Sequence, residues 1–387
     1  MTPIRDDPIV VIHGINGSVL AQTYDDSFDV IWSALQKRFE SISDLELDDQ
    51  GEADKDPRDL IAVQRLEQLA YGELLGRLRR RFPRVPVYIF RYDWRKDLRR
   101  SALELDRFLA TVEHKTGRKS SRVVAHSMGA LVLVALLGLD PERNLRRVGR
   151  TVFAAPVFRG TIDAIRGLVV GEATRFGIQS SEAFRKIARS FPSIYQLVAS
   201  YPGHWDHPKA NANIWDIEDW QRPLRVPAWK RDREREKRAL MGRHLDRARA
   251  FHANDLLDMN GLAKRERDKF LVLYGKGEET RIKLKVKAQN STGQVRYFFD
   301  FEAKSVWGDG DGTVPAVSAE HYARLPHLAV DVSRYSAWWP HLWDDKAKRA
   351  VAGFHAMFTA LDKVQGLIVD WLEGKHPKPS WANIIAP

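Results

Sequence analysis

Residues 123–132 read VVAHSMGALV, and this stretch constrains the fold more than any other part of the chain. Its β-branched start is typical of a buried strand, and the apolar residues that follow Met128 are typical of a helix. The turn between them is tight, because small residues, Ala125 and Gly129, stand two positions on either side of Ser127. Such a turn holds a serine hydroxyl out of the backbone as a nucleophile at the end of a parallel strand. The alternative is an ordinary strand-to-helix turn that contains a serine.

The rest of the chain alternates short apolar runs with helical patterns, which predicts a mostly parallel sheet with helices on both faces. The predicted strands are residues 9–13, 85–92, 122–125, 151–154, 269–274 and 328–332. This regularity breaks after Pro156. The predicted units are an α/β core (1–156 and 266–374), a helical cap or lid insertion (157–265) and an extended tail (375–387). Alternation over 282–301 predicts an antiparallel hairpin, and 41–59 is predicted to be a mobile acidic loop.

Composition limits the chemistry that the chain can perform. Cysteine is absent, so a covalent nucleophile must be a hydroxyl, and disulfides and thiolate metal sites are excluded. The N-terminus lacks the pattern of a cleaved signal peptide, which favours the cytoplasm or export by a signal-less route. The net charge of +11 is concentrated in residues 222–249, where eleven basic residues stand against four acidic ones. Their alternation at helical spacing predicts a solvated helix, the alternative being a patch for an anionic surface.

A serine nucleophile needs a base, and the base needs an orienting acid, each after a later strand. GDGDGTVP (308–315) and WWPHLWD (338–344) follow in that order. Of the two acids in the first stretch we favour Asp311 over Asp309, because Asp-Gly-Thr-Val-Pro has the form of an acid loop. His341 in the second stretch is the predicted base. The alternatives are a hydrogen-bonded Asp/Gly turn, a calcium loop and a structural histidine.

The Gly-rich stretch HGINGS, residues 13–18, follows the first predicted strand and can hold an oxyanion. We expect the backbone amides of Ile15 and Met128 to be the donors. A phosphate loop is the alternative, but the stretch lacks Lys-Ser/Thr and the spacing of a dinucleotide loop.

Several motifs, spread over most of the chain, are shared with one family. They are VVIHGINGSVL (10–20), YDWR (92–95), AHSMGALV (125–132), APVFRGT (155–161), FPSIYQLVASYP (191–202) and GDGDGTVP followed by PHLW (308–315 and 340–343). With these motifs the chain resembles the lecithin:cholesterol acyltransferase family, which includes the lysosomal phospholipase group and many bacterial members. The resemblance implies an α/β-hydrolase fold and a serine enzyme that passes an acyl chain from a lipid ester to water or an alcohol. Asp93 and Arg95 are expected to be a structural pair.

Residues 165–188 lie where that family has a mobile lid. Their apolar residues, among them Leu168, Val169, Phe176 and Ile178, are expected to cover an acyl site. The alternative is a packed pair of helices.

These observations together predict a serine lipase or phospholipase A type acyl hydrolase, or an acyltransferase. Ser127 is the predicted nucleophile, His341 the base and Asp311 the orienting acid, with no metal or organic cofactor. The expected partner is a lipid or other ester; contact with an anionic membrane surface is an alternative, and no nucleic acid is expected. One alternative is a soluble ester or thioester hydrolase with the same triad. Another is an inert binding protein that uses residues 222–249 on an anionic surface or nucleic acid.

Overall fold

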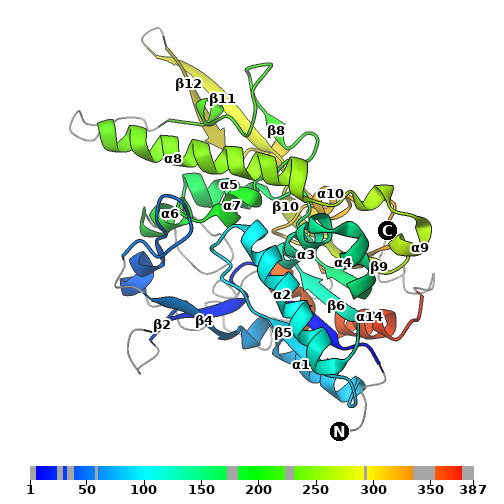
Figure 1. The fold of residues 1–387 in the computed structure, drawn as a ribbon. Coiled ribbons are helices and arrows are strands. Elements are labelled where there is room, and N and C mark those ends of the chain that lie inside the picture. The colour runs from blue at the N-terminus through cyan, green and yellow to red at the C-terminus, as the bar shows by residue number, and fades with distance from the viewer. Residues whose placement is uncertain are drawn as a thin grey trace, which may run out of the picture.

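A six-stranded parallel sheet lies at the centre of the computed structural model (Figure 1). The structure describes residues 6–23, 29–32, 39–56, 60–171, 182–222, 231–291, 294–333 and 354–376. The strands of the sheet are β1 (Ile9–Ile12), β5 (Val87–Phe90), β6 (Ser121–His126), β7 (Val148–Ala154), β9 (Phe270–Lys276) and β14 (His327–Asp331). They lie in the order β14–β9–β7–β6–β1–β5, and every pairing is parallel. All six predicted strands are therefore confirmed.

Helices cover both faces of this sheet, because successive side chains of each strand point to opposite faces. Ile9 and Val11 pack with α1 (Gln68–Arg81) and α14 (Asp362–Leu372). Val10 and Ile12 belong to the other core cluster, with α2 (Leu98–Thr116) and α3 (Met128–Leu139). Helix α3 is buried from Met128 to Leu137, which explains why its sequence is apolar on all sides. Short α4 (Pro141–Arg147) leads from α3 into β7.

The segment between β7 and β9 is mainly helical. Its longer helices are α5 (Ile162–Val169), α6 (Glu182–Ala188), α7 (Pro192–Gln196) and α8 (Arg231–Ala250), and α9 (Lys264–Arg267) precedes β9. In Figure 1, α8 lies next to α7, on the side away from α1. Some of its basic residues form ion pairs with acidic residues of the same helix, for example Lys237 with Glu234. The limits predicted for the cap and the core stay a prediction.

Smaller sheets surround the central one. The predicted hairpin is confirmed as β11 (Leu284–Ser291) and β12 (Gln294–Asp300), and β8 (Trp205–Asp206) adds a parallel edge to β11. The strands β10 (Glu278–Arg281) and β13 (Trp307–Gly310) form an antiparallel pair. A third sheet has the order β3–β2–β4, with β3 (Val30–Trp32), β2 (Ser18–Gln22) and β4 (Ile61–Leu66).

The acidic segment that follows β3 is packed against the molecule, so the prediction of a mobile loop over 41–59 is wrong for the described part of that range, residues 41–56. A 3-10 helix spans Phe39–Leu45, and Leu47 forms an isolated bridge with Asp54. Leu45 and Leu47 are buried in the main core cluster. In the sequence these apolar residues stand among acidic ones, and for that reason the sequence predicts a loop here.

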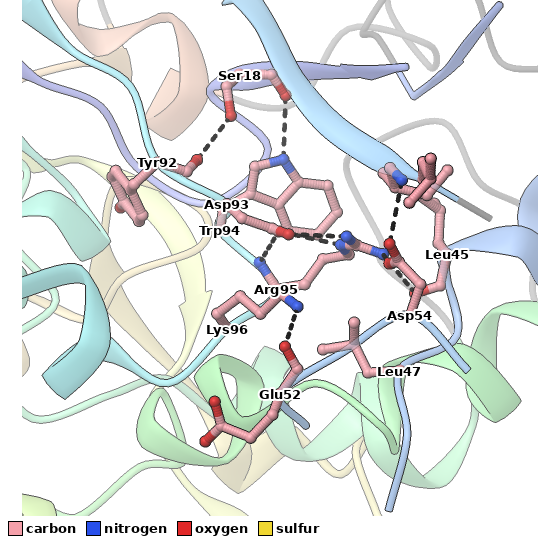
Figure 2. Close-up of polar contacts among 12 residues, drawn as sticks. Ser18, Leu45, Leu47, Glu52, Asp54, Tyr92, Asp93, Trp94, Arg95 and Lys96 are labelled. Carbon is pink, nitrogen blue, oxygen red and sulfur yellow. Dashed lines mark hydrogen bonds and ion pairs between the residues drawn. The ribbon is translucent and has the colours of Figure 1, made fainter. Parts of the chain in front are cut away.

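A buried arginine fixes this segment (Figure 2). Arg95 is fully buried, and its Nη1 lies 2.9 Å from Oδ1 of Asp54 and donates to the carbonyl of Leu45 over 3.1 Å. Its Nε and Nη2 donate to the two carboxylate oxygens of Asp93 over 3.0 and 2.7 Å. Planar guanidinium and carboxylate groups match in this two-bond arrangement. The expected Asp93–Arg95 pair is present, and it also reaches a segment about 50 residues earlier in the chain.

The other YDWR residues, Tyr92 and Trp94, contact β2 and the loop after β1. Trp94 Nε1 donates to the Ser18 carbonyl over 3.0 Å, and Ser18 Oγ donates to the Tyr92 carbonyl over 3.0 Å (Figure 2). The Tyr92 ring stacks on His13 at 4.3 Å. The motif therefore supports the loop that faces Ser127.

Among the described residues, no helix has the length and apolar character needed to cross a membrane.

Candidate active site

Ser127 occupies the turn between β6 and α3 in a strained conformation. Its φ is 53°, a value that non-glycine residues adopt rarely and mostly where the surroundings enforce it. Its N–H donates to the Ala154 carbonyl over 2.9 Å, which fixes the turn against β7. The backbones pack so closely here that a Cβ on Gly129 would lie 2.5 Å from the His13 carbonyl oxygen. The small residue at 129 is therefore a steric requirement of the turn.

A buried histidine lies between Ser127 and a carboxylate. His355, in the short helix α13 (Phe354–Met357), places Nε2 2.7 Å from Ser127 Oγ. Its Nδ1 lies 2.7 Å from Oδ2 of Asp311, which follows β13. Because an ionised carboxylate only accepts, Nδ1 carries the proton and Nε2 is left to accept from the serine hydroxyl. All three side chains are buried, so this chain of hydrogen bonds is shielded from water.

His355 is thus the histidine that the structure brings to Ser127 and Asp311, whereas the predicted base is His341. His341 lies outside the described residues. The order serine, acid, histidine fits either residue, and the aromatic neighbours of His341 do not distinguish them. The signal missed in the sequence is that His355 stands in an apolar stretch, FHAMF (354–358), where a buried imidazole needs a polar partner.

The two acids of the Gly-rich loop have different positions. Asp311 is buried, and its Oδ1 accepts the N–H groups of Thr313 and Val314 over 3.0 and 2.8 Å, which leaves Oδ2 for His355. Asp309 is exposed, and its Oδ1 accepts the Gly277 N–H over 2.8 Å. Asp309 therefore holds the turn after β9 and does not contact the histidine among the described contacts.

The loop after β1 approaches the serine closely. A Cβ on Gly14 would lie 2.7 Å from Cβ of Ser127 and 3.1 Å from its Oγ. The Gly14 N–H donates to the Tyr71 hydroxyl over 2.9 Å. The next amide, that of Ile15, and the Met128 amide at the start of α3 donate to no acceptor among the described residues. Within the described part of the chain both amides thus lack an acceptor, and the N-terminus of α3 adds partial positive charge beside Ser127.

Two further histidines near the serine are held neutral. Burial lowers the pKa of His13 to about 4 and the pKa of His126 to about 3. The proximity of His355 contributes to the low pKa of His126. Neither ring therefore competes with His355 as a proton acceptor near neutral pH.

Among the described residues, no group of three or more His, Cys, Asp or Glu side chains is arranged to hold a metal ion.

The residues expected to cover an acyl site are only partly described. Leu168 and Val169 lie in α5 and are buried in the main core cluster. Phe176 and Ile178 lie outside the described residues. The burial of Leu168 and Val169 agrees both with a packed pair of helices and with a closed lid over an acyl site, so it does not distinguish the two predictions.

A parallel six-stranded sheet flanked by helices, with a serine on a tight strand-to-helix turn, defines the α/β-hydrolase fold. Within this class, the family model of lecithin:cholesterol acyltransferase matches residues 86–259. The resemblance inferred from the motifs is thus confirmed over that range, and the chain is an enzyme of lipase/esterase type.

A solved structure agrees on the fold. A chain of the Tle4–Tli4 complex aligns over 96% of this chain and 99% of its own length, with a TM-score of 0.55 and 16% identity. At this identity the likeness supports the fold alone. A carboxylesterase structure from the ammonia-oxidizing thaumarchaeon Nitrososphaera gargenis aligns over 88% of this chain and 92% of that one, at 9% identity. Its TM-score of 0.34 supports no conclusion. Comparison with curated proteins gives no sequence match.

Proposed function

We propose that the protein is a serine acyl hydrolase of lipase or phospholipase A type that acts through an acyl-serine. The observation that carries the proposal is the buried hydrogen-bond chain from Ser127 through His355 to Asp311. A serine hydroxyl is a weak nucleophile, and an adjacent oriented base is what activates it. The lipid class of the substrate is inferred from the family match over residues 86–259.

In the first half of the proposed reaction, Ser127 Oγ attacks the ester carbonyl carbon while His355 Nε2 takes the hydroxyl proton. The carbonyl oxygen becomes an oxyanion, which the amides of Ile15 and Met128 stabilise. Asp311 keeps the imidazole in the correct tautomer and stabilises its cation. Collapse of the intermediate breaks the bond to the alcohol, which leaves with the proton from His355.

In the second half, a water molecule or a second alcohol enters the site. His355 takes its proton as its oxygen attacks the acyl-serine carbonyl, and the same amides stabilise the second oxyanion. Collapse returns the proton to Ser127 Oγ and releases a fatty acid or a new ester. Hydrolysis and acyl transfer thus differ only in the acceptor.

The test is labelling by a fluorophosphonate probe together with turnover of p-nitrophenyl esters. Ser127→Ala, His355→Ala and Asp311→Asn should each lower kcat by about a thousandfold or more, and Ser127→Ala should abolish labelling. The matched controls are His341→Ala and Asp309→Asn, both expected to keep turnover close to wild type. Loss of activity in His341→Ala, with activity retained in His355→Ala, would refute the assignment of the base.

The substrate class needs a second measurement. We expect long-chain esters to turn over faster than short-chain ones, and a mixed lipid extract to yield free fatty acid or transacylated lipid by mass spectrometry. The Ser127→Ala variant is the control for both. A preference for short, soluble esters would favour the soluble-esterase alternative and leave the triad assignment intact.

A further inference from the structure

A second buried chain of hydrogen bonds runs behind the catalytic one. The Gly14 N–H donates to the Tyr71 hydroxyl over 2.9 Å, and the hydroxyl lies 2.7 Å from Nδ1 of His126. Nε2 of His126 lies 3.0 Å from the backbone carbonyl oxygen of His355. The chain thus begins in the loop beside the predicted oxyanion site and ends on the backbone of the catalytic histidine.

The direction of every bond in this chain follows from its two ends. The amide N–H of Gly14 can only donate, and the carbonyl of His355 can only accept. His126 therefore carries its proton on Nε2, and its Nδ1 accepts the proton of the Tyr71 hydroxyl. This assignment requires a neutral His126, and burial, which lowers the pKa of His126 to about 3, keeps it neutral.

The chain joins two segments that are separate in the sequence and that both approach Ser127. Gly14 approaches the serine from the loop after β1, and His355 approaches from α13. The ring of His126 also lies against that of His355, with centroids 5.3 Å apart. A second bond, from Thr359 Oγ1 to the carbonyl of Ala70 over 2.8 Å, holds the segment after α13 to the start of α1.

We propose that Tyr71 and His126 are positioning residues. They hold the loop after β1, which contains Gly14, and the catalytic histidine in fixed positions relative to Ser127. The proposal rests on the proposed function, because it assigns a task to the same site. Neither side chain touches the reacting atoms. Their hydrogen bonds leave one arrangement of the Gly14 amide and the His355 backbone in which every buried polar group is paired. A displacement of about 1 Å at such a site is enough to cost about a hundredfold in rate.

The test compares Tyr71→Phe, His126→Phe and the double variant, with rates counted per active site titrated by the fluorophosphonate. Each single change breaks the chain, so each should lower kcat by about ten- to a hundredfold while KM changes less than about threefold. The double variant should be no worse than the worse single, because the chain is already broken. Additive losses, or a wild-type kcat in Tyr71→Phe, would overturn the proposal.

A conservative variant tests whether the pairing itself matters. The amide of His126→Gln keeps one acceptor for Tyr71 and one donor for the His355 carbonyl, so it should recover most of the kcat lost in His126→Phe. A glutamine variant that folds and is as slow as the phenylalanine variant would overturn the proposal. Tyr195→Phe is the matched control. It removes a buried hydroxyl that donates to the carbonyl of Arg189 over 2.9 Å, and its kcat should stay at the wild-type value.

The labelling of wild-type protein separates this proposal from the one on which it rests. If the wild type is not labelled at Ser127, the proposed function fails and the positioning role fails with it. If the wild type is labelled and turns over esters while the variants match it, only the positioning role fails.

Discussion

His244 provides a prediction in which the pH dependence of stability can be worked out for one side chain. It lies in α8, is buried to 1% exposure, and its ring packs on Tyr195 with centroids 5.0 Å apart. Neither ring nitrogen has a hydrogen-bond partner among the described residues. Burial first, and then the charges of Arg247 and Arg243, lower its pKa to about 4. Between about pH 4 and pH 6.5 the ring is therefore neutral in the folded protein and protonated in the unfolded chain.

The sign and the size of the effect follow from proton linkage. The unfolded state binds more protons below about pH 6.5, the usual pKa of histidine, so the folded protein loses stability as the pH falls towards about 4. With these two pKa values, His244 costs about 2 kcal/mol of unfolding free energy between about pH 7 and pH 5. Other histidines with a lowered pKa add to the loss in the wild type. Lowered pKa values are also found for His13, His126, His252 and His321.

The variant His244→Phe removes this titration and keeps a ring against Tyr195. Urea unfolding, followed by tryptophan fluorescence, measures its stability against the wild type at each pH. The difference should grow in favour of the variant by about 2 kcal/mol between about pH 7 and pH 5. His244→Gln is the control: its stability near pH 7 will differ because the ring is lost, but its pH dependence should match that of His244→Phe. A difference that does not change with pH would refute the reasoning.

Two further variants probe the supports of the site. Gly14→Ala places a methyl group 2.7 Å from Cβ of Ser127, so kcat should fall about a hundredfold and the free energy of unfolding by about 1–3 kcal/mol. The control is Gly167→Ala, whose methyl group would have no atom within 4 Å, and it should change kcat and the free energy of unfolding little. Full ester turnover in Gly14→Ala would contradict the close approach. Arg95→Met removes the cation of a buried ion-pair network and should lower unfolding stability in urea by about 3–5 kcal/mol. The matched change at an exposed pair, Arg146→Met, should alter it by less than about 1 kcal/mol. Equal stability of the two would rule out the buried network as a support.

The features that the sequence predicts well are those set by neighbouring residues. Each strand of the central sheet is a short apolar run, and its period of two separates the faces that pack on α1 and on α2. The turn at Ser127 is predicted for the same reason, since the strand, the small residues and the helix all lie within 123–132. The hairpin formed by β11 and β12 is again a local alternation followed by a turn.

The features that the sequence does not predict depend on contacts between distant segments. Residues 39–56 contain enough acidic side chains to resemble a solvated loop, and their burial depends on Arg95, about 50 residues later. The same holds for Tyr71, which meets His126 across 55 residues and lies in a helix whose pattern shows only an apolar face. No local pattern specifies the partner in either case.

The histidine at the site shows what kind of signal remains in such cases. Motif order alone admits every histidine after Asp311, and an aromatic setting favours His341. A stronger criterion is energetic, because an imidazole placed in an apolar stretch is buried at a cost unless both of its nitrogens are paired. His355 meets this criterion through Ser127 and Asp311. His126, at the end of a buried strand, meets it through the Tyr71 hydroxyl and the His355 carbonyl. Polar residues inside apolar runs therefore indicate buried networks more directly than their order in the chain does, and the two networks found by this criterion meet at His355.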